Sequence, residues 1–185
     1  MNTKNDKVFL LSTMLLLSTL ICSGQSSLYD YSITTPGGHL YSLNTYQGQK
    51  IVFIVMTSTQ KSTDTSFIAR LDSIAIAQKG NLKMIVVPSY EDGYVSDSAK
   101  TLLNWYGTSL DTSILLSQPL YTHKTSGAQQ DSIFQFLTQA IMNVHFDDDV
   151  AGGGSMYFID EQGTLYYVFD PAAMFSNKAL AMALP

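Results

Sequence analysis

The sequence predicts a single α/β domain in which helices flank a mixed central β-sheet, with a β-hairpin at its N-terminal end. Three observations support this fold class. The segments IVFIV (51–55) and LKMIVV (82–87) are almost continuously apolar, as in strands buried on both faces. A segment with helical periodicity follows the first of them. Two short apolar segments separated by a turn signal, within residues 156–169, are typical of a closing hairpin.

The first 24 residues are expected to be a secretory signal peptide. Two lysines precede an apolar run of 14 residues at 8–21, and the small residues Ser23 and Gly24 follow it. The run is shorter than the ~20 residues that a membrane-spanning helix needs. We therefore expect residues 25–185 to form the domain, and the protein to be exported to the periplasm or the cell exterior.

Cys22 is the only cysteine of the chain. An internal disulfide is therefore excluded, and cleavage before Gln25 would leave a mature protein without any thiol. Bacterial lipoproteins are cut just before a cysteine that then carries lipid, but Ile21 stands where that pattern has a small residue. Association with a membrane is expected only if Cys22 is lipidated.

Charge and composition narrow the possible partners. Hydrophobic residues make up 45% of the 185-residue chain and charged residues only 14%, which favours a packed globule. Without residues 1–24, which hold two lysines and one aspartate, 8 basic residues remain against 14 acidic ones, a net charge of −6. Nucleic acid is not expected as a partner, because its phosphates must be neutralised by clustered Lys and Arg.

The first elements are a hairpin and a buried strand–helix–strand unit. Tyr29, Tyr31 and Ile33 alternate with polar residues, 36–38 forms a turn, and 40–43 returns. The elements expected next are a strand at 51–57, a helix from an N-cap at 62–64 to Gly80, a strand at 82–87 that Pro88 ends, and a helix at about 99–106. Residues 109–128 are expected to be irregular.

The last third is expected to contain a helix, a hairpin and a short final helix. Residues 131–144 carry Ile133, Leu137 and Ile141 on one stripe, which predicts an amphipathic helix. The loop DDDVAGGG follows it. The remaining expected elements are strands at 156–159 and 165–169, a tight turn at 160–163, and a helix at 177–184.

This order, βαβ followed by ββα, is the thioredoxin-like arrangement, and several segments resemble the glutathione peroxidase family. SLYDYSITTPGGHLYSLNTYQGQKIVFIV (27–55) resembles that family's opening hairpin and first core strand. KTSGAQQDSIFQFLTQ (124–139) resembles the segment that leads into its penultimate helix, and YFIDEQGTLYYVFDP (157–171) resembles its closing hairpin. The resemblance covers most of residues 27–184 and implies a thioredoxin-like fold.

The resemblance also implies that the family's four catalytic side chains are absent. Gln60 stands at the position of the peroxide-reacting cysteine or selenocysteine, and Glu91 at that of a glutamine. Gly152 and Gly153 stand at the positions of a Trp-Asn pair, and Gly154 at that of the cis-proline of many thioredoxin-like proteins. Peroxide reduction needs a nucleophile that loses two electrons, as a thiolate does on becoming sulfenic acid. An amide has no comparable oxidised state.

We therefore expect an exported glutathione-peroxidase-like protein that keeps the fold and has lost redox catalysis. It would use no cofactor and would act as a binding or interaction module for a protein or small-molecule partner. The expected face comprises the segments 57–62, 89–92 and 152–155, with Thr57, Ser58, Thr59, Gln60, Ser89, Tyr90, Glu91 and Gly154 as its central residues. Two alternatives stay open: a thiol-dependent peroxidase of the oxidative stress response that uses Cys22 or a partner's sulfur, and a membrane-anchored envelope lipoprotein.

Two other clusters have simpler interpretations. His145 with Asp147, Asp148 and Asp149 offers ligands for a hard cation, but adjacent aspartates before glycines are typical of a solvated loop, and no metal is expected. The glycines at 152–154 precede a strand, so no helix N-terminus is placed to bind phosphate.

A serine–histidine pair is a further weak candidate. Ser58 or Ser62 could pair with His123 or His39, but the Gly-x-Ser-x-Gly motif is absent. Hydroxyl residues near position 62 are better explained as caps of the following helix.

Overall fold

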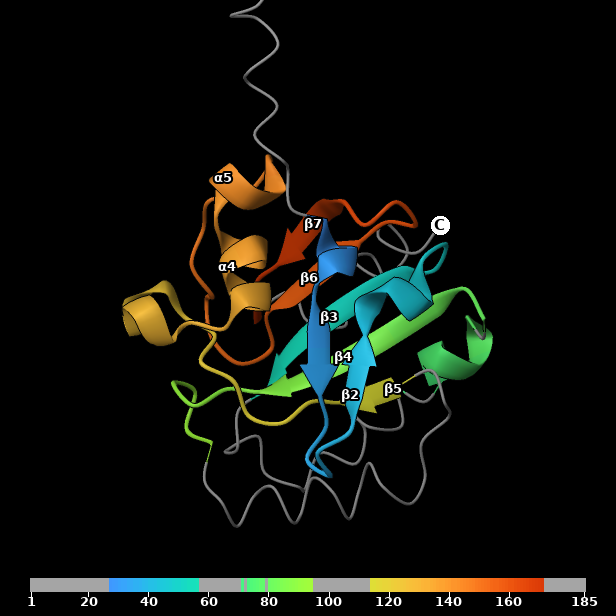
Figure 1. Ribbon diagram of the computed structural model, residues 1–185, viewed down its shortest axis with the longest axis horizontal. Helices are drawn as coiled ribbons and strands as arrows, with labels where there is room; N and C mark the ends of the chain where they lie inside the picture. Colours follow the sequence, from blue (N-terminus) through green and yellow to red (C-terminus); the bar gives the residue numbers. More distant parts are fainter. Residues whose placement is uncertain (1–26, 57–70, 72, 79, 95–113, 172–185) are drawn as a thin grey trace, which may run out of the picture.

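The computed structural model describes residues 27–56, 71, 73–78, 80–94 and 114–171. Their centre is a five-stranded mixed sheet in the order β5-β4-β3-β6-β7 (Figure 1). The strands are β3 (Lys50–Met56), β4 (Leu82–Pro88), β5 (Ile114–Leu116), β6 (Met156–Ile159) and β7 (Leu165–Phe169). β3 pairs in parallel with β4, and β4 with β5, whereas β6 is antiparallel to both β3 and β7. The predicted mixed sheet is confirmed.

The N-terminal hairpin is also confirmed, although its first strand is shorter than the alternation of tyrosines suggests. β1 (Ser32–Thr34) pairs antiparallel with β2 (Leu40–Ser42). Residues Leu28–Asp30 form a 3-10 helix, η1, instead of strand. The reason is a capping box: the Ser27 hydroxyl accepts from the Tyr29 amide, and the Asp30 carboxylate accepts from the Ser27 amide. A second 3-10 helix, η2 (Leu43–Tyr46), follows the hairpin.

Alternation along β3 divides the core into two layers. Val52, Ile54 and Met56 pack on one face of the sheet, together with Leu71 and Ala75 of the segment before β4, whose described residues 71 and 73–77 are helical. On the other face the core contains residues of β3, the hairpin region and α4, namely Ile51, Phe53, Val55, Leu28, Ile33, Phe134 and Leu137. Both faces of β3 are therefore covered, as its unbroken apolar sequence predicts.

The prediction of a single helix at 131–144 is wrong. The structure has α4 (Ser132–Thr138) and α5 (Ala140–Asn143), with Gln139 between them in an extended conformation. At this break the Asn143 side-chain amide donates to the Phe136 carbonyl at 2.7 Å, which an unbroken helix would pair with the Ala140 amide. Because the chain changes direction there, Ile141 is 90% exposed and does not share the buried stripe of α4.

The expectation of irregular structure at 109–128 is corrected in two places. Ile114–Leu116 form β5, which pairs in parallel with Met84–Val86 of β4, and the 3-10 helix η3 occupies Lys124–Gln129. A strand of three residues is too short to produce a recognisable period in the sequence. β5 forms because it pairs with the edge of β4.

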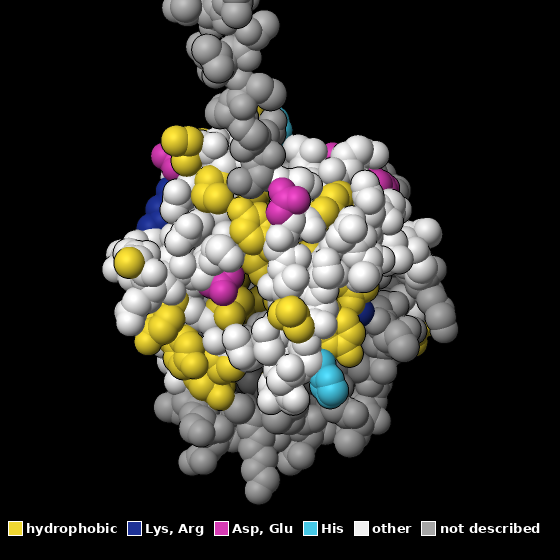
Figure 2. All heavy atoms as spheres, viewed as in Figure 1, with side chains coloured by type: hydrophobic (Ala, Val, Ile, Leu, Met, Phe, Trp, Pro, Cys, Tyr) yellow, Lys and Arg dark blue, Asp and Glu magenta, His cyan; other side chains and the backbone are white. Residues whose placement is uncertain are grey.

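One face of the molecule carries both acidic and apolar side chains. Figure 2, drawn from the same side as Figure 1, shows acidic side chains on either side of a strip of hydrophobic side chains.

None of the helices among the described residues combines the length and the apolarity needed to cross a bilayer.

Val144 provides the first testable prediction. It ends α5 at φ 72°, the only non-glycine residue of the described chain with a positive φ, and it is 56% exposed. A left-handed conformation costs an L-residue roughly 1–2 kcal/mol and is hardest for β-branched side chains. Val144→Gly is therefore expected to raise the free energy of unfolding by about 1 kcal/mol, measured by urea denaturation. Val144→Ala should give a smaller gain, and a less stable glycine variant would contradict the argument.

Candidate functional site

The candidate site lies where three segments meet at one edge of the sheet. The carboxyl ends of the parallel strands β3 and β4 share this edge, and β6 begins there because it runs antiparallel to β3. The segments are Ser89–Asp92 after β4, Thr122–Ser126, and Gly152–Ser155 before β6. In open α/β sheets the carboxyl ends of strands are the usual place for a ligand.

Glu91 is the centre of a hydrogen-bond network that fixes the loop at 122–126. One carboxylate oxygen accepts from the Ser89 hydroxyl at 3.1 Å and from the Thr122 amide at 3.0 Å. The other accepts from the His123 amide at 3.2 Å and from the Ser126 hydroxyl. A carboxylate has about four acceptor positions, and these contacts occupy them.

The ionisation of Glu91 follows from these contacts. Burial raises the pKa of the carboxyl, but the hydrogen bonds from Ser126, Thr122 and His123 outweigh it, and the pKa lies below its usual value. Glu91 is therefore ionised at neutral pH, with its lone pairs already bound. This arrangement suits a residue that holds a loop in place better than a free general base.

Ser89 joins the end of β4 to the same network. Its side chain is fully buried, and its hydroxyl lies 2.9 Å from the Thr122 hydroxyl and accepts from the Asp92 amide at 3.3 Å. The Ser89 amide donates to the Met56 carbonyl at the end of β3. Ser89 is thus a buried structural contact and is not presented to a ligand.

Tyr90 is the exposed member of the segment. It is 44% exposed, and its ring lies 4.7 Å from that of Tyr121 and 5.5 Å from that of Tyr94, measured between centroids. Three rings in contact form an aromatic surface beside the Glu91 network. Such surfaces supply large contact areas at binding sites.

The structure also pairs His123 with Asp92. The His123 Nε2 atom lies 3.1 Å from the Asp92 carboxylate, and the two side chains are 19% and 12% exposed. Among the described residues the imidazole has no serine or threonine hydroxyl as a partner. Sequence reasoning missed Asp92 as the partner of His123, because 31 residues separate them and no motif links the two loops.

The glycine segment before β6 lies against the end of β3. The Gly154 amide donates to the Val55 carbonyl at 2.7 Å, and the Val55 amide donates to the Ser155 carbonyl at 2.9 Å. Gly152 adjoins Asp92, since a Cβ atom on Gly152 would lie 3.7 Å from the Asp92 carboxylate. Gly152 and Gly153 therefore belong to the candidate site but bring no side-chain donor to it.

The structure brings together part of the expected binding face. Ser89, Tyr90, Glu91 and Gly154 all lie at the same edge of the sheet. The other expected residues, Thr57, Ser58, Thr59, Gln60 and the alternative nucleophile Ser62, lie outside the described residues. His39 is exposed in the turn between β1 and β2.

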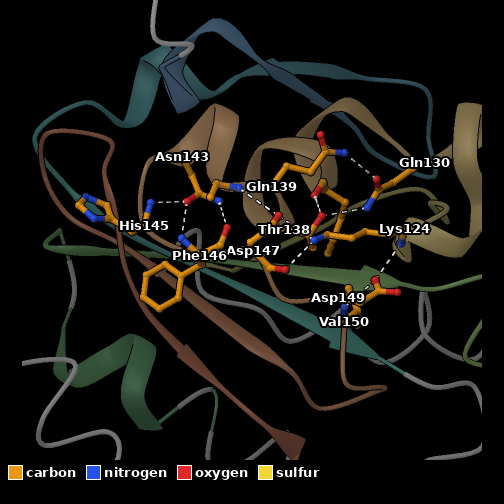
Figure 3. Close-up of polar contacts among 12 residues, drawn as sticks. Lys124, Gln130, Thr138, Gln139, Asn143, His145, Phe146, Asp147, Asp149 and Val150 are labelled. Carbon is orange, nitrogen blue, oxygen red and sulfur yellow. Dashed lines mark hydrogen bonds and ion pairs between the residues drawn. The ribbon is translucent and has the colours of Figure 1, made fainter.

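The acidic loop after α5 is organised by Asn143 and Lys124 (Figure 3). The buried Asn143 amide donates to the Phe146 carbonyl at 2.9 Å and accepts from the His145 and Phe146 amides. The Lys124 ammonium pairs with Asp147 at 3.0 Å, and the Lys124 backbone amide donates to Asp149 at 2.8 Å.

These contacts bear on the weak metal candidate. Lys124 occupies acceptor atoms of Asp147 and Asp149, two of the four residues that the sequence offered as ligands together with His145 and Asp148. Across the described ranges, no three His, Cys, Asp or Glu side chains gather in an arrangement able to hold a metal ion.

The order of the described elements, the mixed sheet and the N-terminal hairpin define a thioredoxin-like α/β fold, the fold class that the sequence predicts. Among solved structures the chain is similar to T. cruzi GPX1, with a TM-score of 0.61, 14% identity, and coverage of 86% of this chain and 95% of that one. It is also similar to Trgpx in its apo form, with a TM-score of 0.58, 11% identity, and coverage of 84% and 90%.

A thioredoxin-family thiol:disulfide interchange protein from Chlorobium tepidum is a further neighbour, with a TM-score of 0.51, 15% identity, and coverage of 84% of this chain and 93% of that one. No protein-family model matches the chain, and no curated protein does either. At these identities the likeness establishes the fold, which is that of glutathione peroxidase-like and thioredoxin-like redoxins.

Proposed function

We propose that the protein is a redoxin-fold binding module without peroxidase chemistry of its own. The observation that carries this proposal is the absence of any cysteine beyond Cys22, which lies in the expected signal peptide. A thiolate is the atom that attacks peroxide in this class of reaction. The resemblance places Gln60 at the position of this thiolate. The domain therefore has no thiol of its own that peroxide could oxidise.

The state of Glu91 supports the same proposal. A general acid or base must exchange a proton with a substrate and therefore needs a free hydrogen-bonding position. Glu91 uses its acceptor atoms on Ser89, Thr122, His123 and Ser126, and so stabilises the loop. The edge of the sheet is thereby held in a fixed shape.

A fixed edge that carries an aromatic cluster, with one ring exposed and two partly buried, is suited to recognition. Tyr90, Tyr94 and Tyr121 form the aromatic part, and the Asp92–His123 pair lies in the adjoining segments. Tyrosines are frequent among the residues that dominate binding energy at interfaces. The proposed partner is a protein or a small molecule that contacts this aromatic surface. With residues 1–24 as a signal peptide, the encounter would take place outside the cytoplasm.

The proposal predicts no turnover of peroxide. Purified full-length chain, mixed with hydrogen peroxide and either glutathione or a thioredoxin system, is expected to consume reductant at the rate of buffer alone. An active glutathione peroxidase serves as the positive control in the same assay. Turnover above the buffer rate would overturn the proposal.

The variant Cys22→Ser separates the alternatives. The variant is expected to consume reductant in the peroxide assay at the same rate as the unaltered chain. If the unaltered chain turned over peroxide and Cys22→Ser did not, the thiol-dependent peroxidase would be the correct reading. Intact mass of the exported protein would then establish whether Cys22 remains after cleavage.

A further inference from the structure

A pocket separate from the Glu91 network opens beside the start of β6. It has a cavity volume of about 620 Å³ and lies between the loop that follows α5 and the paired strands β6 and β7. Its wall includes the apolar side chains of Phe146, Val150 and Val168. Pockets of roughly 300–1,000 Å³ with apolar walls and a few polar groups are typical of small-molecule sites.

The charged residues that line this pocket within the described chain are all acidic. Asp148 and Asp149 come from the loop after α5, and Asp170 comes from the end of β7. In the described part of the chain the Asp148 and Asp170 carboxylates form neither a hydrogen bond nor an ion pair, and no lysine or arginine lines the pocket. Three carboxylates around one cavity produce a negative potential that favours a cation.

Tyr157 provides an independent indication of a ligand. Its side chain is 1% exposed and lines the pocket, yet its hydroxyl has no hydrogen-bond partner within the described residues. Burial, and then the charges of Asp149, Asp148 and Asp170, raise the pKa of this hydroxyl. A buried polar group is nearly always paired, so an unpaired one at the wall of a pocket indicates a site for an external donor or acceptor.

The arrangement of the carboxylates decides between a metal ion and an organic cation. Within the described chain no three acidic or histidine side chains come close enough to coordinate one metal ion. A metal ion is bound by polar ligand atoms, so the apolar side chains of Phe146 and Val168 would not contribute to its coordination. An extended molecule with separated positive charges and a hydrocarbon chain satisfies both features.

We infer that this pocket binds an aliphatic polyamine. Its ammonium groups pair with Asp148, with Asp170 and with the second carboxylate oxygen of Asp149, whose other oxygen accepts from the Lys124 and Val150 amides. One N–H group donates to the Tyr157 hydroxyl. Its methylene groups contact Phe146, Val150 and Val168, where the Phe146 ring can also face an ammonium group. The inference goes beyond the proposed function, because it holds whether or not the chain reduces peroxides.

Isothermal titration of the purified full chain with spermidine tests this inference. Saturable binding is expected, weakening as salt is added because the attraction is between charges. Asp148→Asn and Asp170→Asn should each reduce affinity by about three- to five-fold, the upper part of the range for an exposed ion pair. Tyr157→Phe should reduce it by a similar factor without lowering the melting temperature, since the hydroxyl that it removes has no partner in the fold.

Glu161→Gln is the matched control, because it removes one carboxylate at the β6–β7 turn, which lies at the opposite end of these strands from Asp170. Its affinity for spermidine is expected to stay within two-fold of the unaltered chain. The absence of saturable binding would overturn the inference. So would an equal loss in Glu161→Gln and Asp170→Asn, which indicates nonspecific attraction, or displacement of spermidine by magnesium at an equal concentration, which indicates a metal site.

Discussion

Glu91→Gln is expected to lower the free energy of unfolding by about 2–4 kcal/mol. The substitution keeps the size of the side chain but replaces one acceptor oxygen by an NH₂ group, which cannot accept from the donors that face it. Those donors are the amides of Thr122 and His123 and the hydroxyls of Ser89 and Ser126. Each buried donor left unpaired costs roughly 1–3 kcal/mol. Urea denaturation at pH 7 measures the effect.

Glu161→Gln makes the same chemical change at a carboxylate without a hydrogen-bond partner in the described chain. Its effect should stay within about 0.5 kcal/mol, as is usual for surface substitutions. If Glu91→Gln were as mild as this control, the hydrogen bonds of Glu91 would not be holding the loop at 122–126.

The lowered pKa of Glu91 gives this prediction a pH dependence. Because the folded-state pKa lies below the unfolded-state value, ionised Glu91 contributes stability that is fully present above the unfolded pKa, about 4.3. The contribution disappears as the pH falls through the folded pKa. The stability difference between the unaltered chain and Glu91→Gln should therefore be constant near neutral pH and shrink below about pH 4.

Gly163→Ala is expected to destabilise the fold by about 3 kcal/mol. Gly163 has φ +85°, and a Cβ atom there would lie 2.7 Å from Cε2 and 3.0 Å from Cδ2 of Tyr29. The ring cannot easily move away, because the Tyr29 hydroxyl donates to the Glu161 carbonyl at 2.9 Å. The left-handed backbone costs an L-residue roughly 1–2 kcal/mol, and overpacking typically adds 1–3 kcal/mol.

Gly80→Ala separates the two costs. Gly80 has a nearly identical φ of +86°, but a Cβ atom there would have no neighbour within 4 Å. Its loss should be about 1 kcal/mol, the backbone cost alone. A double-mutant cycle with Tyr29→Ala should recover the steric part of the Gly163→Ala effect. Equal losses for Gly163→Ala and Gly80→Ala would show that Tyr29 does not restrict the β6–β7 turn.

The sheet could be predicted where burial leaves a pattern along the chain. β3 and β4 are covered on both faces, so each appears as an apolar run of β-branched residues, and both were located to within one or two residues. The turn of the closing hairpin needs a glycine, and Gly163 supplies it. Those features depend on neighbours in sequence or on burial alone.

The prediction was wrong where distant groups decide the local conformation. The break between α4 and α5 depends on the Asn143 side chain, which takes a backbone carbonyl from the helix. β5 exists because the edge of β4 accepts it. Neither cause can be read from the periodicity of the segment itself.

The candidate site, too, could be predicted from the sequence only in part. That Ser89, Tyr90 and Glu91 follow a buried strand and so lie at the edge of the sheet where that strand ends could be predicted from the sequence, as could the lack of any cysteine in residues 25–185. The hydrogen bonds from Glu91 to residues 122–126, and the pair Asp92–His123, join segments that are more than 30 residues apart.

By itself, then, the sequence determined the thioredoxin-like α/β fold class and the absence of a thiol from residues 25–185, because burial patterns and residue types are properties of the chain. The tertiary structure decided that Glu91 holds a loop, that His123 pairs with Asp92, and that Tyr157 lines a pocket together with three aspartates. Hydrogen bonds and electrostatic fields act over a few ångströms of space whatever the separation in sequence, so only the folded chain establishes them.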